Sequence, residues 1–178
     1  MYFSAYFRYC PVCGSEKFIF NNEKSKKCDD CGFVFYVNPS SAVAAFIVNS
    51  KNELLVCRRA KEPAKGTPDL PGGFVDAHET AEQAVEREIM EELNSAVSAT
   101  NYLFSLPNEY LYSGLTIPTL DMFYRCELQD YKRIQAADDV AECFFVPIAE
   151  LNPSDFGLNS IRKAVEIFRN SFPNFRVY

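Results

Sequence analysis

The sequence predicts an α/β fold, in which one globular domain follows a small module closed by four cysteines. Of its 178 residues, 48% are hydrophobic and 15% aromatic, which suits one compact core better than two full-sized domains. Two pairs of cysteines stand near the N-terminus, and patterns typical of strands and helices alternate after them. We therefore expect a module over residues 1–37 and a main domain over residues 38–178.

The module carries two Cys-x-x-Cys-Gly motifs, which contain Cys10 with Cys13 and Cys28 with Cys31. The glycine after each pair lets the backbone turn sharply, so that its amides approach the thiolates. Four thiolates at this spacing predict a tetrahedral zinc site in a zinc ribbon, and a module of about 30 residues has too little core to fold without such a site. The alternative is two redox-active dithiols, but the duplicated, ribbon-like spacing favours zinc.

Three further cysteines lie among apolar residues in the main domain. Seven cysteines without an export signal indicate reduced thiols or metal ligands rather than disulfides. We therefore predict buried structural thiols, without a chemical role, at Cys57, Cys126 and Cys143.

The main domain opens with two predicted strands, residues 42–48 and 54–58, which the polar turn 49–53 joins into a hairpin. A loop rich in proline and glycine follows over residues 62–73. The later part predicts three strands and a final amphipathic helix, with an irregular tyrosine-rich stretch after the first of these strands. The strands are expected at 101–106, 119–128 and 141–148, and the helix at 160–172.

Between the loop and the later strands, a helix is predicted from Ala81 to about residue 94. It begins where it does because Thr80, with Gln83 three residues later, forms a capping box. No Gly-x-Gly-x-x-Gly loop follows a strand, and no phosphate-binding loop ends in Lys-Ser/Thr. Dinucleotide-binding folds and ATPases are therefore disfavoured.

One face of this helix is acidic. At 100° per residue, Glu88, Glu91 and Glu92 fall within an arc of about 100°, beside an apolar stripe that would pack on a sheet. An acidic face of a helix is usually just solvated, but carboxylates next to a packing stripe are costly when unpaired. The face also follows a Gly-Gly turn, whose carbonyls could join the same site. These hard oxygen ligands suit a divalent cation, Mg²⁺ or Mn²⁺.

The turn and the helix together resemble the Nudix box: Gly, five residues, Glu, seven residues, then Arg-Glu-apolar-x-Glu-Glu-x-Gly-apolar. The positions that match are Gly73, Glu79, Arg87, Glu88, Ile89, Glu91 and Glu92. Asn94 replaces the last glycine of the box, and Ser95 replaces the apolar residue after it. Because asparagine is the best substitute for glycine in a left-handed helix cap, we expect the geometry to survive.

The resemblance to the Nudix hydrolase family implies an α/β/α sandwich with a mixed sheet. It also implies hydrolysis of a nucleoside diphosphate linked to another moiety, with Mg²⁺ or Mn²⁺. By this resemblance, Glu91, Glu92 and the Gly73 carbonyl would be metal ligands. Glu88 would either bind metal or act as the general base for the attacking water.

Two further sets of roles follow from the same resemblance. Arg87 would pair with Glu79 and hold the loop against the helix. One more metal ligand usually comes from a late loop, where Glu142 is favoured and Asp139 is the alternative.

Five residues are candidates for substrate contacts. Arg58 and Arg59 end a predicted strand, where they could meet phosphate oxygens or form surface salt bridges instead. Phe74, Tyr110 and Tyr112 could stack on a base, although aromatic residues in such segments more often belong to the core.

A four-cysteine ribbon directly before a Nudix domain resembles the NADH pyrophosphatase branch. The downstream motif of that branch, Ser-Gln-Pro-Trp-Pro-Phe-Pro-x-Ser, is absent, and the chain contains no tryptophan. ADP-ribose, NADH and diadenosine polyphosphates therefore all remain candidate substrates, with the first two ahead.

The net charge of −6 and the pI near 4.9 argue against broad binding to nucleic acid or anionic membrane. No apolar run reaches the length of a membrane span, and the first residues lack a signal-peptide pattern, so we expect a cytoplasmic protein. A nucleotide-sensing or nucleic-acid-binding regulator is the alternative, although family members turned to sensing tend to lose the glutamates. Whether the ribbon mediates dimerisation stays open.

Overall fold

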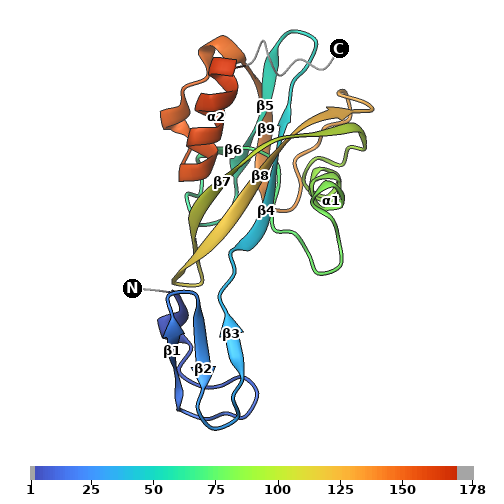
Figure 1. Ribbon diagram of the computed structural model, residues 1–178. Coiled ribbons are helices and arrows are strands. Elements are labelled where there is room, and N and C mark those ends of the chain that lie inside the picture. The colour runs from blue at the N-terminus through green and yellow to red at the C-terminus, as the bar shows by residue number, and fades with distance from the viewer. Residues whose placement is uncertain (1–2, 172–178) are drawn as a thin grey trace. The chain divides into compact units, whose positions relative to one another are not determined.

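The computed structural model describes residues 3–171, which divide into two compact units (Figure 1). The first unit holds the chain up to Ser40 together with Glu109–Pro118, and the second holds the remainder. The first unit thus also includes the tip of a hairpin that the sequence assigns to the main domain.

The first unit is built on a three-stranded antiparallel sheet, in the order β1-β2-β3. Its elements are η1 (Phe3–Tyr6), β1 (Phe18–Asn22), β2 (Ser25–Cys28) and β3 (Val34–Tyr36). The lysine-rich residues 24–27 lie in and just before β2. Among the described residues of this unit, the hydrophobic cluster is small: Cys10, Phe18 and Cys28 are buried, and three phenylalanines pack around them.

The second unit is built on two three-stranded sheets, in the orders β4-β8-β7 and β6-β5-β9. The strands are β4 (Ser40–Ile47), β5 (Glu53–Arg59), β6 (Pro68–Asp69), β7 (Val97–Tyr112), β8 (Leu115–Leu128) and β9 (Val140–Pro147). The tips of β7 and β8 belong to the first unit. All five strands predicted in the main domain therefore exist, with different ends, and the short β6 was not predicted.

Two predictions about these strands were wrong. Residues 42–48 and 54–58 do not form a hairpin ladder, because β4 and β5 belong to different sheets and only the bridge between Val48 and Leu54 joins them. Both strands carry buried residues on both faces, because each lies in the core. There β4 pairs with β8, and β5 pairs with β6 and β9. The tyrosine-rich stretch is not irregular either. It continues β7 and returns as β8 through Ser113 and Gly114, whose φ angles of 50° and 79° suit a two-residue hairpin turn.

The helices α1 (Ala81–Leu93) and α2 (Asn159–Ser171) lie on opposite sides of the sheets (Figure 1). Alternate residues of β4 face the two helices. Phe46 lies in the cluster of α2, where its ring stacks on Phe168 at 4.0 Å, whereas Ile47 lies in the cluster of α1 with Ile89. This arrangement confirms the predicted α/β fold with helices on both sides of mixed sheets.

The remaining helices are the short η2 (Ile148–Glu150) and η3 (Pro153–Asp155). Phe172, the last residue of the predicted final helix, lies outside the described residues, as do residues 173–178 of the predicted main domain and the first two residues of the module. Within residues 3–171, no helix combines the length and the apolar character needed to cross a membrane.

Candidate functional site

The Gly-Gly turn lies against β4 through three backbone hydrogen bonds. Ala45 donates to the Pro71 carbonyl at 2.8 Å, Val43 donates to the Gly73 carbonyl at 2.8 Å, and the Val75 amide donates back to Ser41 at 3.0 Å. At Gly72, with φ +147°, a Cβ atom would lie 2.1 Å from the Val43 carbonyl oxygen. Glycine is therefore required where the turn meets the strand.

Gly73 lies directly against the end of the Glu88 side chain. A Cβ atom there would lie 2.5 Å from Oε1 of Glu88, so the turn and the helix carboxylate are in contact. The Gly73 carbonyl accepts one hydrogen bond from Val43 and keeps a second lone pair for another partner.

The ends of α1 are defined as predicted. The Thr80 hydroxyl accepts from the Gln83 amide at 3.2 Å, and the Gln83 side chain accepts from the Thr80 amide at 2.8 Å. Asn94 caps the other end in the left-handed conformation, with φ 50° and ψ 40°, and its amide donates to Met90. The asparagine thus takes the cap geometry expected of the missing glycine, and the acidic face has a defined position.

Arg87 joins the helix to the loop before it. Its Nη2 donates to Glu79 Oε1 at 2.7 Å and to the Phe74 carbonyl at 3.0 Å, while Nε donates to Glu79 Oε2 at 3.2 Å. Glu79 also accepts from the Asp76 amide at 2.7 Å. The hydrogen bond from Arg87 lowers the pKa of Glu79 below its ordinary value, so this carboxylate stays charged.

Replacing Arg87 with lysine is expected to lower the free energy of unfolding by about 1–3 kcal/mol, because an ammonium cannot reproduce the fork to Glu79 and also reach the Phe74 carbonyl. A double-mutant cycle that combines Arg87→Lys with Glu79→Gln, measured by urea unfolding, checks this result. The double variant should lose less than the sum of the two single variants. Strict additivity would contradict the pairing.

The same guanidinium offsets the repulsion within the acidic face. Its Nη1 donates to Glu88 Oε1 at 2.8 Å and to Glu91 Oε2 at 3.1 Å. Burial nevertheless raises the pKa of Glu88 above its ordinary value, against the opposing effect of Arg87.

Glu92 is the most deeply buried of the three glutamates, with 7% of its surface exposed. Its Oε2 accepts from the Gly72 amide at 2.9 Å. Burial raises its pKa to about 9 despite this hydrogen bond, and the negative charges of Glu88, Asp69 and Asp139 raise it further. Buried carboxylates that repel one another fit a divalent cation, since its charge would compensate theirs.

Of the two acidic residues expected in a late loop, Asp139 lies in the turn before β9, but Glu142 lies in β9 itself, and both already contact basic side chains. Glu142 accepts from Arg58 Nε across β5 and β9, and Asp139 forms an ion pair with Lys61. Asp139 also acts electrostatically on Glu92. The choice between Glu142 and Asp139 as the additional ligand stays a prediction.

The two arginines predicted to meet phosphate both have protein partners. Arg58 donates to Glu142 and, through Nη1, to the Gly66 carbonyl at 2.9 Å. Arg59 donates to Asp69, a buried carboxylate that the sequence did not single out, and to the Pro63 carbonyl at 2.7 Å. Burial raises the pKa of Asp69, and Arg59 opposes this shift.

The three predicted stacking residues fall in different units. Phe74 is partly buried in the second unit, and its backbone carbonyl accepts from Arg87. Tyr110 and Tyr112 end β7 in the first unit, where Tyr112 is largely exposed. Their role in substrate binding stays a prediction.

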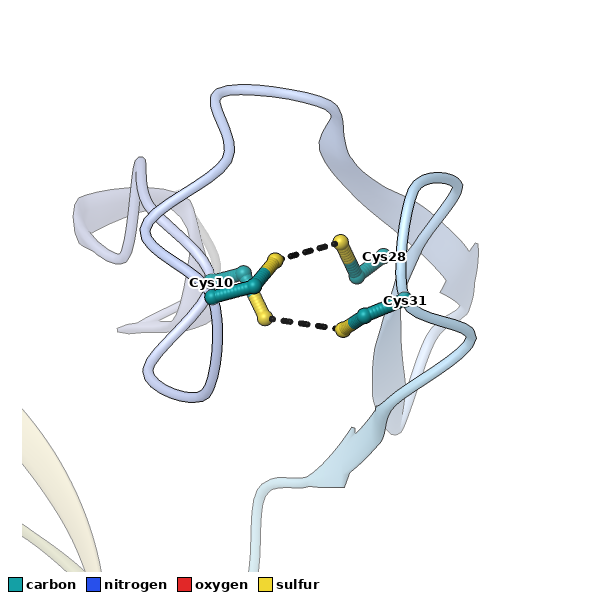
Figure 2. A group of neighbouring side chains, drawn as sticks. Cys10, Cys28 and Cys31 are labelled. Carbon is teal, nitrogen blue, oxygen red and sulfur yellow. Dashed lines mark hydrogen bonds between the residues drawn. The ribbon is translucent and has the colours of Figure 1, made fainter.

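The four N-terminal cysteines converge at one point (Figure 2). All four sulfur atoms lie within 4.8 Å of one another, and the pairs Cys10–Cys31 and Cys13–Cys28 are each 3.6 Å apart. A tetrahedron with zinc–sulfur bonds of about 2.3 Å places its sulfurs about 3.8 Å apart, so the cluster fits a tetrahedral thiolate site. The backbone amides of Cys31 and Asp30 lower the pKa of Cys28 to about 7, which favours the thiolate that a metal requires. The pKa values of Cys13 and Cys31 are raised in the same cluster, so a metal would have to displace their protons in order to bind.

The sequence also missed a pair of neighbouring thiols in the second unit. Cys57 and Cys126 are buried as predicted, but Cys143 is partly exposed because β9 is an edge strand of its sheet. Its sulfur lies 3.6 Å from that of Cys57. No local pattern could predict this pair, because 86 positions separate the two residues.

Comparison with known proteins gives one family match and several relatives. The NUDIX domain model matches residues 38–166. The chain is similar to the NAD-capped RNA hydrolase NudC of Vibrio parahaemolyticus, with 32% identity over 102 residues, which are 56% of this chain and 38% of that protein. It is also similar to the ADP-ribose pyrophosphatase of Methanocaldococcus jannaschii, with 45% identity over 67 residues, which are 38% of this chain and 39% of that protein.

The matched regions thus span about two fifths of the length of these two relatives. Among solved structures, a NUDIX hydrolase from Nitrosomonas europaea superimposes with a TM-score of 0.72. The two chains are 23% identical, and the match covers 95% of this chain and 94% of the other. At this identity the likeness concerns the fold.

Proposed function

The chain belongs to the Nudix family, and from this premise we propose that it is a metal-dependent pyrophosphohydrolase. Its substrate would be a nucleoside diphosphate linked to another moiety, such as ADP-ribose or an NADH-like dinucleotide. The observation that carries this proposal is the buried carboxyl group of Glu92, which lies beside other acidic groups at the Gly-Gly turn.

We assign the divalent cation, Mg²⁺ or Mn²⁺, to Glu91, Glu92 and the carbonyl of Gly73. When bound, the cation would neutralise diphosphate charge and lower the pKa of a coordinated water. Glu88 contacts Gly73 and would either complete this ligand set or accept the proton of the attacking water. Arg87 would hold the loop against the helix through its hydrogen bonds to Glu79 and to the Phe74 carbonyl.

Proton binding competes with cation binding at this site. Glu92 holds its proton up to a pH of about 9 when no cation is present, so a cation must displace that proton in order to bind. The affinity for Mg²⁺ should therefore rise with pH across the neutral range.

The substrate proposal rests on the relatives. One of them is named for NAD-capped RNA and the other for ADP-ribose, and both substrates contain an adenosine diphosphate. For this chain we propose the same group, with Arg58 and Arg59 as candidate phosphate contacts and Phe74 as a candidate base contact in the second unit. Tyr110 and Tyr112 stay candidates from the sequence alone.

We also propose that the cysteine cluster binds one structural Zn²⁺ ion. The sulfur distances support this assignment, as does the size of the first unit, which has only a small hydrophobic core. The role proposed for zinc is to fold this unit, and no catalytic step is assigned to it.

A substrate panel tests the proposed activity. Purified protein with Mg²⁺ or Mn²⁺ should release AMP from ADP-ribose or NADH faster than from a diadenosine polyphosphate or ATP. Preference for the diadenosine polyphosphate would instead support the alternative hydrolase. Nucleotide binding without turnover, by folded protein with bound cation, would support a sensing role and contradict the proposal.

A further inference from the structure

Cys57 and Cys143 face each other across two neighbouring strands. They are directly opposite in the antiparallel register of β5 and β9, and their sulfurs are 3.6 Å apart. Cys57 is buried, with 2% of its surface exposed, whereas Cys143 is partly exposed. Both are free thiols.

This geometry allows a disulfide without backbone rearrangement. Directly opposite residues in an antiparallel pair have Cα atoms about 4.5–5.5 Å apart, which lies within the range of about 4.4–6.8 Å found for disulfides. Rotation of the two side chains is then enough to bring the sulfurs to bonding distance.

The pair also lies close to Glu92, one of the proposed cation ligands. On the other edge of β5, Cys57 pairs with Asp69 of β6. The negative charges of Asp69 and Glu92 act electrostatically on the Cys57 thiol. The next pair in the β5–β9 register is Arg58 with Glu142. A bond between the two sulfurs would therefore fix β9 to β5 directly beside the acidic site.

We propose that Cys57 and Cys143 form a reversible disulfide by exchange with a low-molecular-weight disulfide. The sulfur of Cys143, the more exposed residue of the pair, attacks the small disulfide, forms a mixed disulfide, loses its proton to solvent and releases one small thiolate. The sulfur of Cys57 then attacks the Cys143 sulfur, loses its proton and releases the second small thiolate. Two protein thiols are oxidised, and one small disulfide is reduced to two thiols.

The disulfide should stabilise the fold. It would close a loop of 86 positions that contains α1, β7 and β8, and so restrict the unfolded chain. We expect an increase in Tm of roughly 5–10 °C. This inference does not depend on the proposed hydrolase activity.

The test treats full-length, zinc-loaded protein with oxidised glutathione and maps the peptides under non-reducing conditions. The expected result is a linked peptide pair containing Cys57 and Cys143, with a higher Tm that dithiothreitol reverses. Cys126→Ser should behave like the wild type. In Cys57→Ser, Cys143 should stop at the mixed disulfide with glutathione.

If Cys57→Ser does not fold, Cys143→Ala keeps the experiment informative, because a substitution at the partly exposed Cys143 should disturb the core less. Cys143→Ala should form no linked peptide pair and should show no increase in Tm after treatment. Two free thiols at Cys57 and Cys143 after treatment would overturn the proposal. A mixed disulfide that persists on Cys143 in the wild type would also overturn it.

Discussion

Glu92→Gln is expected to lower the Mg²⁺-dependent hydrolysis rate by at least about 100-fold, because it removes the charge of the most buried of the proposed ligands. Glutamine is nearly the same size, and its carbonyl oxygen can still accept the hydrogen bond from the Gly72 amide. The loss of activity should therefore not come from misfolding. Initial rates at saturating Mg²⁺ measure it.

The same substitution should stabilise the protein when no divalent cation is present. The pKa of Glu92 rises from an ordinary value of 4.5 to about 9 in the folded state. Between these values the folded state retains a proton that the unfolded state has released, so a rise in pH favours unfolding of the wild type. Glutamine has no proton to lose, and the variant should be more stable at pH 8 by up to about 5 kcal/mol.

The gain should grow as pH rises through this window and vanish below about pH 4.5, which urea unfolding at several pH values measures. Added Mg²⁺ should stabilise the wild type and leave the variant nearly unchanged. The matched control is Glu86→Gln on the same helix, because Glu86 is exposed and its side chain bonds Thr100 outside the acidic site. If both substitutions had equal effects on activity, Glu92 would have no special role.

Cys28→Ser is expected to abolish zinc binding and to unfold the first unit. Cys28 is fully buried, and its sulfur belongs to both the cysteine cluster and the small core of the unit. A serine hydroxyl is a poor zinc ligand, and a unit of this size has little else to hold it together. Metal analysis should fall from one zinc per chain to nearly none, and amide hydrogens of β1–β3 should exchange rapidly.

Cys126→Ser is the control for the loss of a buried thiol, since Cys126 lies in β8 within the second unit and is not one of the four clustered cysteines. It should keep its zinc and the protection of β1–β3. A wild-type protein that contains no zinc but still protects these strands would contradict the zinc assignment and support the dithiol alternative.

The sequence predicted the local features of the molecule well. The capping box at Thr80, the left-handed cap at Asn94 and the four-cysteine cluster depend on residues close in the chain or on a repeated motif, and all three are present. The position of the Nudix-box helix α1 could be predicted because its capping residues and its apolar stripe are also close in the chain. Short-range hydrogen bonds and helical periodicity determine these features.

Features that depend on strand register could not be predicted. The contacts of Arg59 with Asp69, of Arg58 with Glu142 and of Cys57 with Cys143 arise where β5 lies between β6 and β9. The predicted hairpin of β4 and β5 failed for the same reason, since long-range pairing overrides a local turn signal.

The rate of diphosphate cleavage as a function of Mg²⁺ concentration, compared between wild type and Glu92→Gln, tests the proposed function most directly. AMP released from ADP-ribose or NADH gives the rate. The wild type should be inactive without a divalent cation and should saturate as Mg²⁺ rises, while the variant should stay at least about 100-fold slower throughout. A wild-type rate that is independent of Mg²⁺, or an equal rate in the variant, would contradict a metal-dependent mechanism at this acidic site.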